Sequence, residues 1–159
     1  MPDGLYERDA LAWAEQQAEL LRRLAAGERV NALVDWSNVI EEVHDVGLSE
    51  LRACESLMQQ AMIHLLKLRI RPDSPAADHW REKAGIFLDD VARRFSPSMR
   101  QRISLSELYG KALRRVRTGA GEAEALPDEC PFAFEELLAG DPALLLSRIV
   151  PPDPERHRS

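Results

Sequence analysis

Apolar residues recur every three or four positions along most of the chain, which is the period of one face of an α-helix. In the first part this pattern predicts a helix over 6–26 that stops at Gly27, and a second helix over 32–46 that stops at Gly47. Glycine readily takes the left-handed conformation that follows many helices, so we expect Gly47 to end the second helix and reverse the chain. The expected buried face of this second helix consists of Trp36, Val39, Ile40, Val43 and Val46.

A third helix is predicted from Ser49, a favourable N-cap residue, to about Arg69. It carries apolar residues on one face and on a second face near its end, which is typical of a central helix packed on two sides. Pro72 and Pro75 interrupt the helical pattern, and a fourth helix is predicted over 78–95 and a fifth over 98–117.

The C-terminal part follows a different pattern. Residues 126–132 are too rich in proline to form a helix and too apolar to remain exposed to solvent. We therefore expect this segment to lie across the other helices. Short helical pieces are predicted near 134–138 and 142–147, and no alternating strand pattern is present. The predicted fold is all-α: a compact bundle of about five helices with an irregular C-terminal segment packed across it. We expect a single domain over 1–150, followed by a polar disordered tail over 151–159.

The composition is that of an ordinary soluble globular protein, with 159 residues, 45% hydrophobic and 30% charged. The first residues lack the basic and apolar regions of a signal peptide, and no apolar run approaches the roughly 20 residues of a membrane span. We therefore expect a cytoplasmic protein that does not associate with membranes. Cys54 and Cys130 lack metal-site spacing and are expected to be thiols.

Charge is unevenly distributed along the chain, whose net charge is -6. Residues 1–60 hold 12 acids and 5 bases, residues 61–118 hold 6 and 13, and residues 119–159 hold 9 and 3. We expect these blocks to neutralise one another, whereas the alternative is an anion-binding face on the fourth and fifth helices. The overall acidity and the lack of a nucleic-acid motif argue against nucleic acid as a partner. The candidate basic surface consists of Arg100, Arg102, Lys111, Arg114, Arg115 and Arg117.

Glu41 and His44 have the Glu-x-x-His spacing of di-iron helical bundles. Such a site needs a second copy of the motif and two further glutamates, and the sequence has no second copy. We therefore interpret the motif as a solvated acidic helix face and predict neither a metal nor another cofactor.

His64 lies in the apolar run 62–66 and is expected to be mostly buried. A buried imidazole needs a hydrogen-bond partner, because an unsatisfied polar group inside a protein costs about 1 to 3 kcal/mol. A turn at Gly47 would bring the start of the second helix level with His64, so a partner is expected there or on the fourth helix. His64 is then either structural or a general base. The candidate pocket comprises Asp35, Asn38, Glu42, His64, Trp80 and Arg81.

Several short segments occur in an order and spacing that match a known family. They are Leu5-Tyr6-Glu7-x-Asp9 with Trp13, Glu41-Glu42-Val43 ending in Gly47, His64-Leu65-Leu66-Lys67, Trp80-Arg81, and Pro127-x-Glu129-Cys130-Pro131-Phe132. On these segments the chain resembles the bacterial family called Domain of Unknown Function 29. The resemblance implies a compact all-helical bundle of no established activity, and it supplies no catalytic residues.

Three functions fit these observations. We favour a helical interaction or regulatory module, working as a homo-oligomer or with an unidentified protein partner, because it needs no catalytic constellation and none is evident. The alternatives are a small enzyme or ligand binder that uses the candidate pocket, and a nucleic-acid-associated regulator that uses the basic fifth helix.

Overall fold

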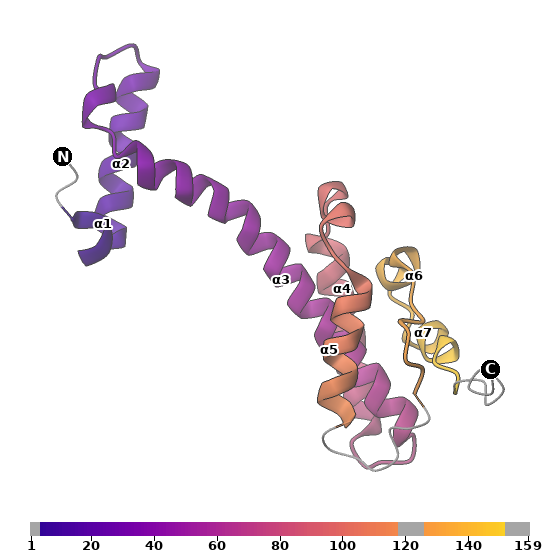
Figure 1. Cartoon of the computed structure of the whole chain (residues 1–159). Coiled ribbons are helices and arrows are strands. Elements are labelled where there is room, and N and C mark those ends of the chain that lie inside the picture. Colours follow the sequence, from indigo (N-terminus) through magenta and orange to yellow (C-terminus); the bar gives the residue numbers. More distant parts are fainter. Residues whose placement is uncertain (1–3, 118–125, 152–159) are drawn as a thin grey trace. The chain divides into compact units, whose positions relative to one another are not determined.

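The computed structural model describes residues 4–117 and 126–151, and in these residues it contains α-helices, short 3-10 helices and no strand (Figure 1). The all-α prediction is therefore confirmed. The chain divides into two compact units, one up to Ser49 and one from Glu50 onward, which we call the N-terminal unit and the C-terminal unit. Most of the predicted tail, residues 152–159, lies outside the described residues.

The N-terminal unit contains α1 (Leu5–Arg8), α2 (Ala10–Ala25), the 3-10 helix η1 (Asn31–Leu33) and the first part of α3 (Trp36–Ile70). Asp9 separates α1 from α2, and its carboxylate accepts a hydrogen bond from the Ala12 N–H at 3.0 Å, which caps α2. Gly27 has the positive φ of 92° that follows a helix end, in agreement with the predicted stop. The small apolar core of this unit is made of Leu20, Val30 and Val34, with Leu21, Leu24 and Val39 packed against it.

The predicted turn at Gly47 is wrong, because α3 continues through this residue as one helix from Trp36 to Ile70. Gly47 does not have a positive φ. Glycine permits a left-handed turn but does not require one, and its cost inside a helix is only about 1 kcal/mol. No proline removes a backbone donor here, so the helical hydrogen bonds continue. The predicted second and third helices are therefore one element.

The C-terminal unit contains the rest of α3, then α4 (Ala77–Arg94), η2 (Pro97–Gln101), α5 (Leu105–Arg117), α6 (Phe134–Ala139) and α7 (Pro142–Arg148). Met58, Met62, Leu65 and Leu66 of α3 are completely buried. Ala61 and Ile63 are also buried, and residues two positions apart on a helix point to nearly opposite sides. The helix α3 is therefore packed on two sides in this unit, as its sequence predicted.

The fifth helix begins later than predicted. Residues 97–101 form η2, and α5 starts after Ser104, whose hydroxyl accepts a hydrogen bond from the Glu107 N–H at 3.2 Å. Met99 and Ile103 are buried in the core, which holds this connection against the helices. A serine cap and local burial therefore set the helix start, which the proline alone did not reveal.

The C-terminal segment packs on the core of its unit, as predicted. Leu126 and Phe132 are buried, and the Tyr109 hydroxyl donates a hydrogen bond to the Pro127 carbonyl at 2.5 Å. The Arg69 guanidinium, from α3, donates to the Ile149 carbonyl at 2.9 Å. Figure 1 shows α6 and α7, the two predicted helical pieces, following this segment. Within the described residues, no helix combines the length and the apolar character that a membrane span requires.

Candidate functional site

Asp35 holds the start of α3 against α2. Its Oδ2 atom accepts hydrogen bonds from the Trp13 indole at 3.0 Å and from the Asn38 side-chain amide at 2.8 Å. Its backbone N–H donates to the Gln17 side-chain oxygen at 2.7 Å. The hydrogen bonds from Asn38 and Trp13 stabilise the carboxylate and lower the pKa of Asp35. The Asp35 carboxylate therefore has a structural role, which is to hold the start of α3 in place.

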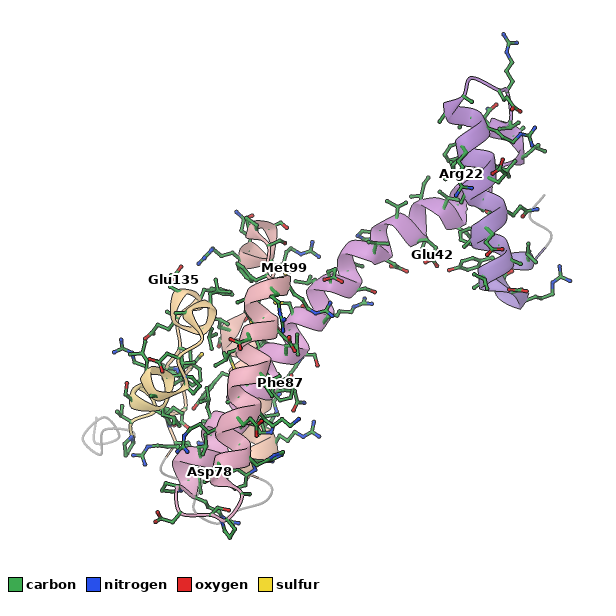
Figure 2. The ribbon with its side chains drawn as sticks, turned by 180° about the vertical axis from the view of Figure 1, so that it is seen from behind. Arg22, Glu42, Asp78, Phe87, Met99 and Glu135 are labelled. Atoms are coloured by element: carbon green, nitrogen blue, oxygen red, sulfur yellow. The ribbon has the colours of Figure 1, made fainter. Side chains whose placement is uncertain are left out.

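Glu42 has a similar structural role about two turns further along the chain, in α3, where Figure 2 labels it. It accepts a hydrogen bond of 2.5 Å from the Tyr6 hydroxyl. The Tyr6 ring meets the Trp13 ring edge to face, with centroids 4.9 Å apart. This hydrogen bond, followed by burial and by the charges of Glu42, Glu41 and Asp45, raises the pKa of Tyr6 to about 12. The phenol is therefore a stable donor and not an acid–base group near neutral pH.

His64 lies in the C-terminal unit, where it is mostly but not completely buried, in agreement with the prediction. Its Nδ1 atom donates to the Gln60 carbonyl at 2.7 Å, and its ring centre lies 5.4 Å from that of Phe87. Figure 2 labels Phe87 on α4. The partner predicted for His64 was wrong: α4 contributes an apolar contact, and the hydrogen bond stays within α3. Burial is the first cause of a lowered pKa for His64, and the positive charge of Lys67 is a smaller one.

The other predicted pocket residues of this unit have partners of their own. The Lys67 ammonium lies 5.9 Å from the centre of the Trp80 ring, a cation–π contact. Arg81 forms an exposed ion pair with Asp78 at 3.1 Å, one turn earlier on α4. In the part of the chain that the structure describes, no carboxylate is hydrogen-bonded to His64.

The six predicted pocket residues are thus distributed over both units. Asp35, Asn38 and Glu42 belong to the N-terminal unit, where the first two form one hydrogen-bonded network. His64, Trp80 and Arg81 belong to the C-terminal unit. The prediction placed them together because it assumed a turn at Gly47, and α3 has no such turn.

Part of the predicted basic surface is engaged in ion pairs. Arg100 contacts Glu135 at 2.5 Å, and its guanidinium lies 5.7 Å and 5.3 Å from the ring centres of Phe95 and Phe134. Arg117 contacts Asp128 at 2.9 Å. These contacts attach the C-terminal segment to η2 and α5. The remaining members of the predicted surface are exposed and are Arg102, Lys111, Arg114 and Arg115.

The most unusual surface of the N-terminal unit is an apolar face of α3. Trp36, Ile40, Val43 and Val46 recur at helical spacing and are 41%, 65%, 70% and 68% exposed, and we call these four residues the α3 stripe. Sequence analysis predicted that this face would be buried, and that prediction was wrong. Of the predicted face only Val39 packs against the core of the unit, which Leu20 of α2 forms with Val30 and Val34.

A pocket of about 720 Å³ adjoins the α3 stripe. Its apolar lining includes Trp13, Leu20, Leu33 and Trp36, so Trp36 belongs to both the pocket and the stripe. The Trp36 indole N–H donates to the Asn31 carbonyl at 2.8 Å, which fixes the ring beside η1. Polar residues at the pocket include Gln16, Glu19 and Arg23.

Of the predicted pocket residues, Asp35 lines this pocket. Sequence analysis missed the rest of it because it placed Trp36 on a buried face. One signal for a functional surface was present in the sequence. Between Arg29 and Arg52 the chain has five acidic residues and neither lysine nor arginine, beside a regular apolar stripe.

Metal-binding and thiol chemistry have little support in this structure. Among the described residues, no group of three His, Cys, Asp or Glu side chains is placed to hold a metal ion. Glu41 and His44, the two members of the Glu-x-x-His motif, are exposed. Cys54 and Cys130 are free thiols, and burial raises the pKa of both, which makes them less reactive.

Residues 5–141 match the family described as Domain of unknown function DUF29. The chain belongs to the DUF29 family. This DUF29 chain is also similar to a solved structure, the crystal structure of an alpha-helical protein of unknown function from Rhodospirillum rubrum. The two are 25% identical, with a TM-score of 0.67, over 92% of this chain and 98% of the other. No curated protein matches the chain. The family resemblance inferred from sequence is confirmed, and membership of DUF29 brings no activity with it.

Proposed function

We propose that this DUF29 chain is a protein-interaction module that acts without catalysis, and that the N-terminal unit carries its binding surface. The single observation that supports this proposal is the exposure of the α3 stripe. Scattered apolar residues are normal on protein surfaces, but a contiguous apolar face is typical of a surface that binds another molecule.

The energetics favour binding through this face. Fully burying one large apolar side chain contributes about 1.5 to 3 kcal/mol, and the stripe offers four such residues, each still well exposed. The face is part of a formed helix, so a partner would not have to order it. An interface centred on Trp36 would have the aromatic anchor that is frequent at the centre of protein interfaces.

Catalysis by the neighbouring polar residues has less support. Asp35 and Glu42 are used to attach α3 to α2 and α1, through the Trp13 indole and the Tyr6 hydroxyl. Among the described residues, every buried side-chain nitrogen or oxygen has a hydrogen-bond partner. No buried polar side chain near the stripe is therefore left without a partner.

A photo-crosslinking experiment tests the proposal. A photoreactive amino acid is placed at Val43, and at Ile86 of α4 as a matched control, because both are exposed apolar residues. In living cells we expect a discrete protein adduct from position 43, lost when Ile40→Ser is added, and no such adduct from position 86. The proposal would be contradicted if both positions gave the same adduct, or if neither position gave one. A second tagged copy of the chain shows whether the adduct is a self-pair.

A further inference from the structure

We infer that the α3 stripe and the adjoining pocket bind a basic amphipathic helix of a partner protein. This inference rests on the proposed function and adds the chemical class of the partner. It is carried by the charge around the stripe, together with the length of the stripe and the position of the pocket.

The segment that presents the stripe is strongly acidic. From Val30 to Leu51 its charged residues are Asp35, Glu41, Glu42, Asp45 and Glu50, with no lysine or arginine. In the part of the chain that the structure describes, only Glu50 of these five forms an ion pair, with Arg94 at 3.3 Å. The stripe therefore lies in a negative field.

These acids are close enough to affect a partner docked on the stripe. Helical projection places Glu42 beside the stripe, and Glu41 and Asp45 on the other side of the same helix. A helix is only about 10 to 12 Å across with its side chains, which is near the screening length of about 8 Å at physiological salt. Lysine or arginine beside the apolar face of a partner helix would be attracted at this range, whereas acids would be repelled.

A second copy of the chain fits the stripe less well than such a partner. A symmetric pair of stripes would bring together ten carboxyl groups from the two acidic segments, with no cation in either segment to separate them. Like charges across an interface disfavour association. The same acids oppose nucleic acid and anionic lipid, so a cationic protein helix is the occupant that the charge favours.

The dimensions match recognition of a helix. The stripe extends from Trp36 to Val46, about 15 Å along the helix axis, which corresponds to three turns. A partner helix with apolar residues at three- and four-residue intervals can pack along this length. At the Trp36 end, the pocket of about 720 Å³ can receive a large apolar side chain from the partner, between Leu33 and Leu20.

The test measures binding of synthetic peptides to the full chain by fluorescence anisotropy. The probe is an 18-residue labelled peptide with leucine at positions a and d of each heptad and lysine at most other positions. One control peptide has glutamate in place of lysine, and a second has the same composition with no apolar face. We expect the basic amphipathic peptide to bind at least tenfold more tightly than either control, and more weakly as salt increases.

Variants of the chain then locate the binding surface. Val43→Ser should weaken binding of the basic peptide at least tenfold, whereas Ile86→Ser, a matched exposed apolar change on α4, should leave it unchanged. The double change Glu41→Lys and Asp45→Lys should weaken binding by a similar factor. Glu82→Lys with Asp89→Lys makes the same change in charge on α4 and should have little effect. Circular dichroism confirms that each variant is folded.

The outcomes separate this inference from the proposed function. Position-specific crosslinks at Val43 with equal binding of the basic and acidic peptides would overturn the partner class and leave the interaction module in place. A concentration-dependent dimer that Val43→Ser dissociates would assign the stripe to a second copy and overturn the inference. Absence of both crosslinks and peptide binding would overturn both proposals. Equal loss of binding in the α4 control variants would show non-specific attraction and also overturn the inference.

Discussion

The two units of this chain use the same helix in opposite ways. In the C-terminal unit the apolar residues of α3, such as Met58 and Leu65, are completely buried beneath α4, α5 and the C-terminal segment. In the N-terminal unit the apolar residues of α3 are exposed, and only Val39 reaches a core. A helical apolar pattern therefore indicates a face that needs a partner, and the partner can be the same chain or another molecule.

The two units also differ in the size of their apolar cores, and we relate this difference to stability and to binding. The buried core of the C-terminal unit contains 22 described residues, whereas that of the N-terminal unit is formed by Leu20, Val30 and Val34. The N-terminal unit relies in addition on hydrogen bonds that join Trp13 and Gln17 to Asp35, just before α3, and Tyr6 to Glu42 within α3. We interpret the C-terminal unit as a stable scaffold, and we propose the N-terminal unit as the binding region.

The largest expected effect compares a buried and an exposed residue of α3. Leu65→Ala should lower the free energy of unfolding by about 2 to 5 kcal/mol, because it leaves a cavity in the core. Val43→Ala, at a residue that is 70% exposed, should change it by no more than about 0.5 kcal/mol. Urea unfolding measures both. If Val43→Ala were as costly as Leu65→Ala, the stripe would be covered by the chain itself and the comparison would fail.

A glycine comparison tests the continuity of α3. Gly47 is helical, and a Cβ added there would meet nothing within 4 Å apart from the adjoining backbone of its own helix. Gly47→Ala should therefore stabilise the chain by about 0.5 to 1 kcal/mol. Gly140 has a φ of 71° between α6 and α7, and Gly140→Ala should destabilise it by about 1 kcal/mol. Thermal unfolding distinguishes the two signs. A loss of stability in Gly47→Ala would instead support the turn at Gly47 that was predicted from sequence.

The Tyr6–Glu42 hydrogen bond should make the N-terminal unit sensitive to alkaline pH. The pKa of Tyr6 is raised to about 12 in the folded chain against an ordinary value of 10. Because the neutral phenol is favoured by folding, its contribution to stability is complete below pH 10 and is lost as pH rises towards 12. Ultraviolet titration of tyrosine absorbance, in the chain and in Glu42→Gln, measures this shift. Titration of Tyr6 near pH 10 in the unaltered chain would show that the hydrogen bond is absent.

The smallest expected effect concerns His64 in the C-terminal unit. Burial lowers its pKa below 6.5, so the unfolded chain binds the proton more readily than the folded chain. The contribution of neutral His64 is therefore present above pH 6.5 and is lost as pH falls through the lowered pKa. NMR titration of the imidazole protons measures the direction. A pKa above 6.5 would indicate a carboxylate beside His64 and would return it to consideration as a general base.

Much of the fold could be predicted from local sequence. The break at Pro72 and Pro75, the helix stop at Gly27 and the irregular segment before Phe134 all depend on the conformational limits of proline and glycine. The start of α5 could not be placed in the same way, because the cap at Ser104 competes with the proline signal at Pro97.

The candidate site was less predictable. Asp35, Asn38 and Glu42 were singled out from sequence, and all three make hydrogen bonds within the N-terminal unit. Asp35 accepts from Trp13 and from Asn38, and Glu42 accepts from Tyr6, whereas none of the three is bonded to His64. The aromatic partners, Trp13 of Asp35 and Tyr6 of Glu42, are 22 and 36 positions away in the chain. Helical spacing identifies a face, but it carries no information about which distant residue meets that face.

The sequence by itself determined that this chain is helical, where most of its helices end, and that it belongs with DUF29, because these properties depend on local backbone preferences and on short ordered motifs. Only the tertiary structure decided whether α3 turns at Gly47 and which of its apolar residues are buried. The physical reason is that glycine permits two conformations at similar cost, and that burial depends on whether another element covers the face. The same apolar period therefore forms the core at Leu65 and an exposed stripe at Val43.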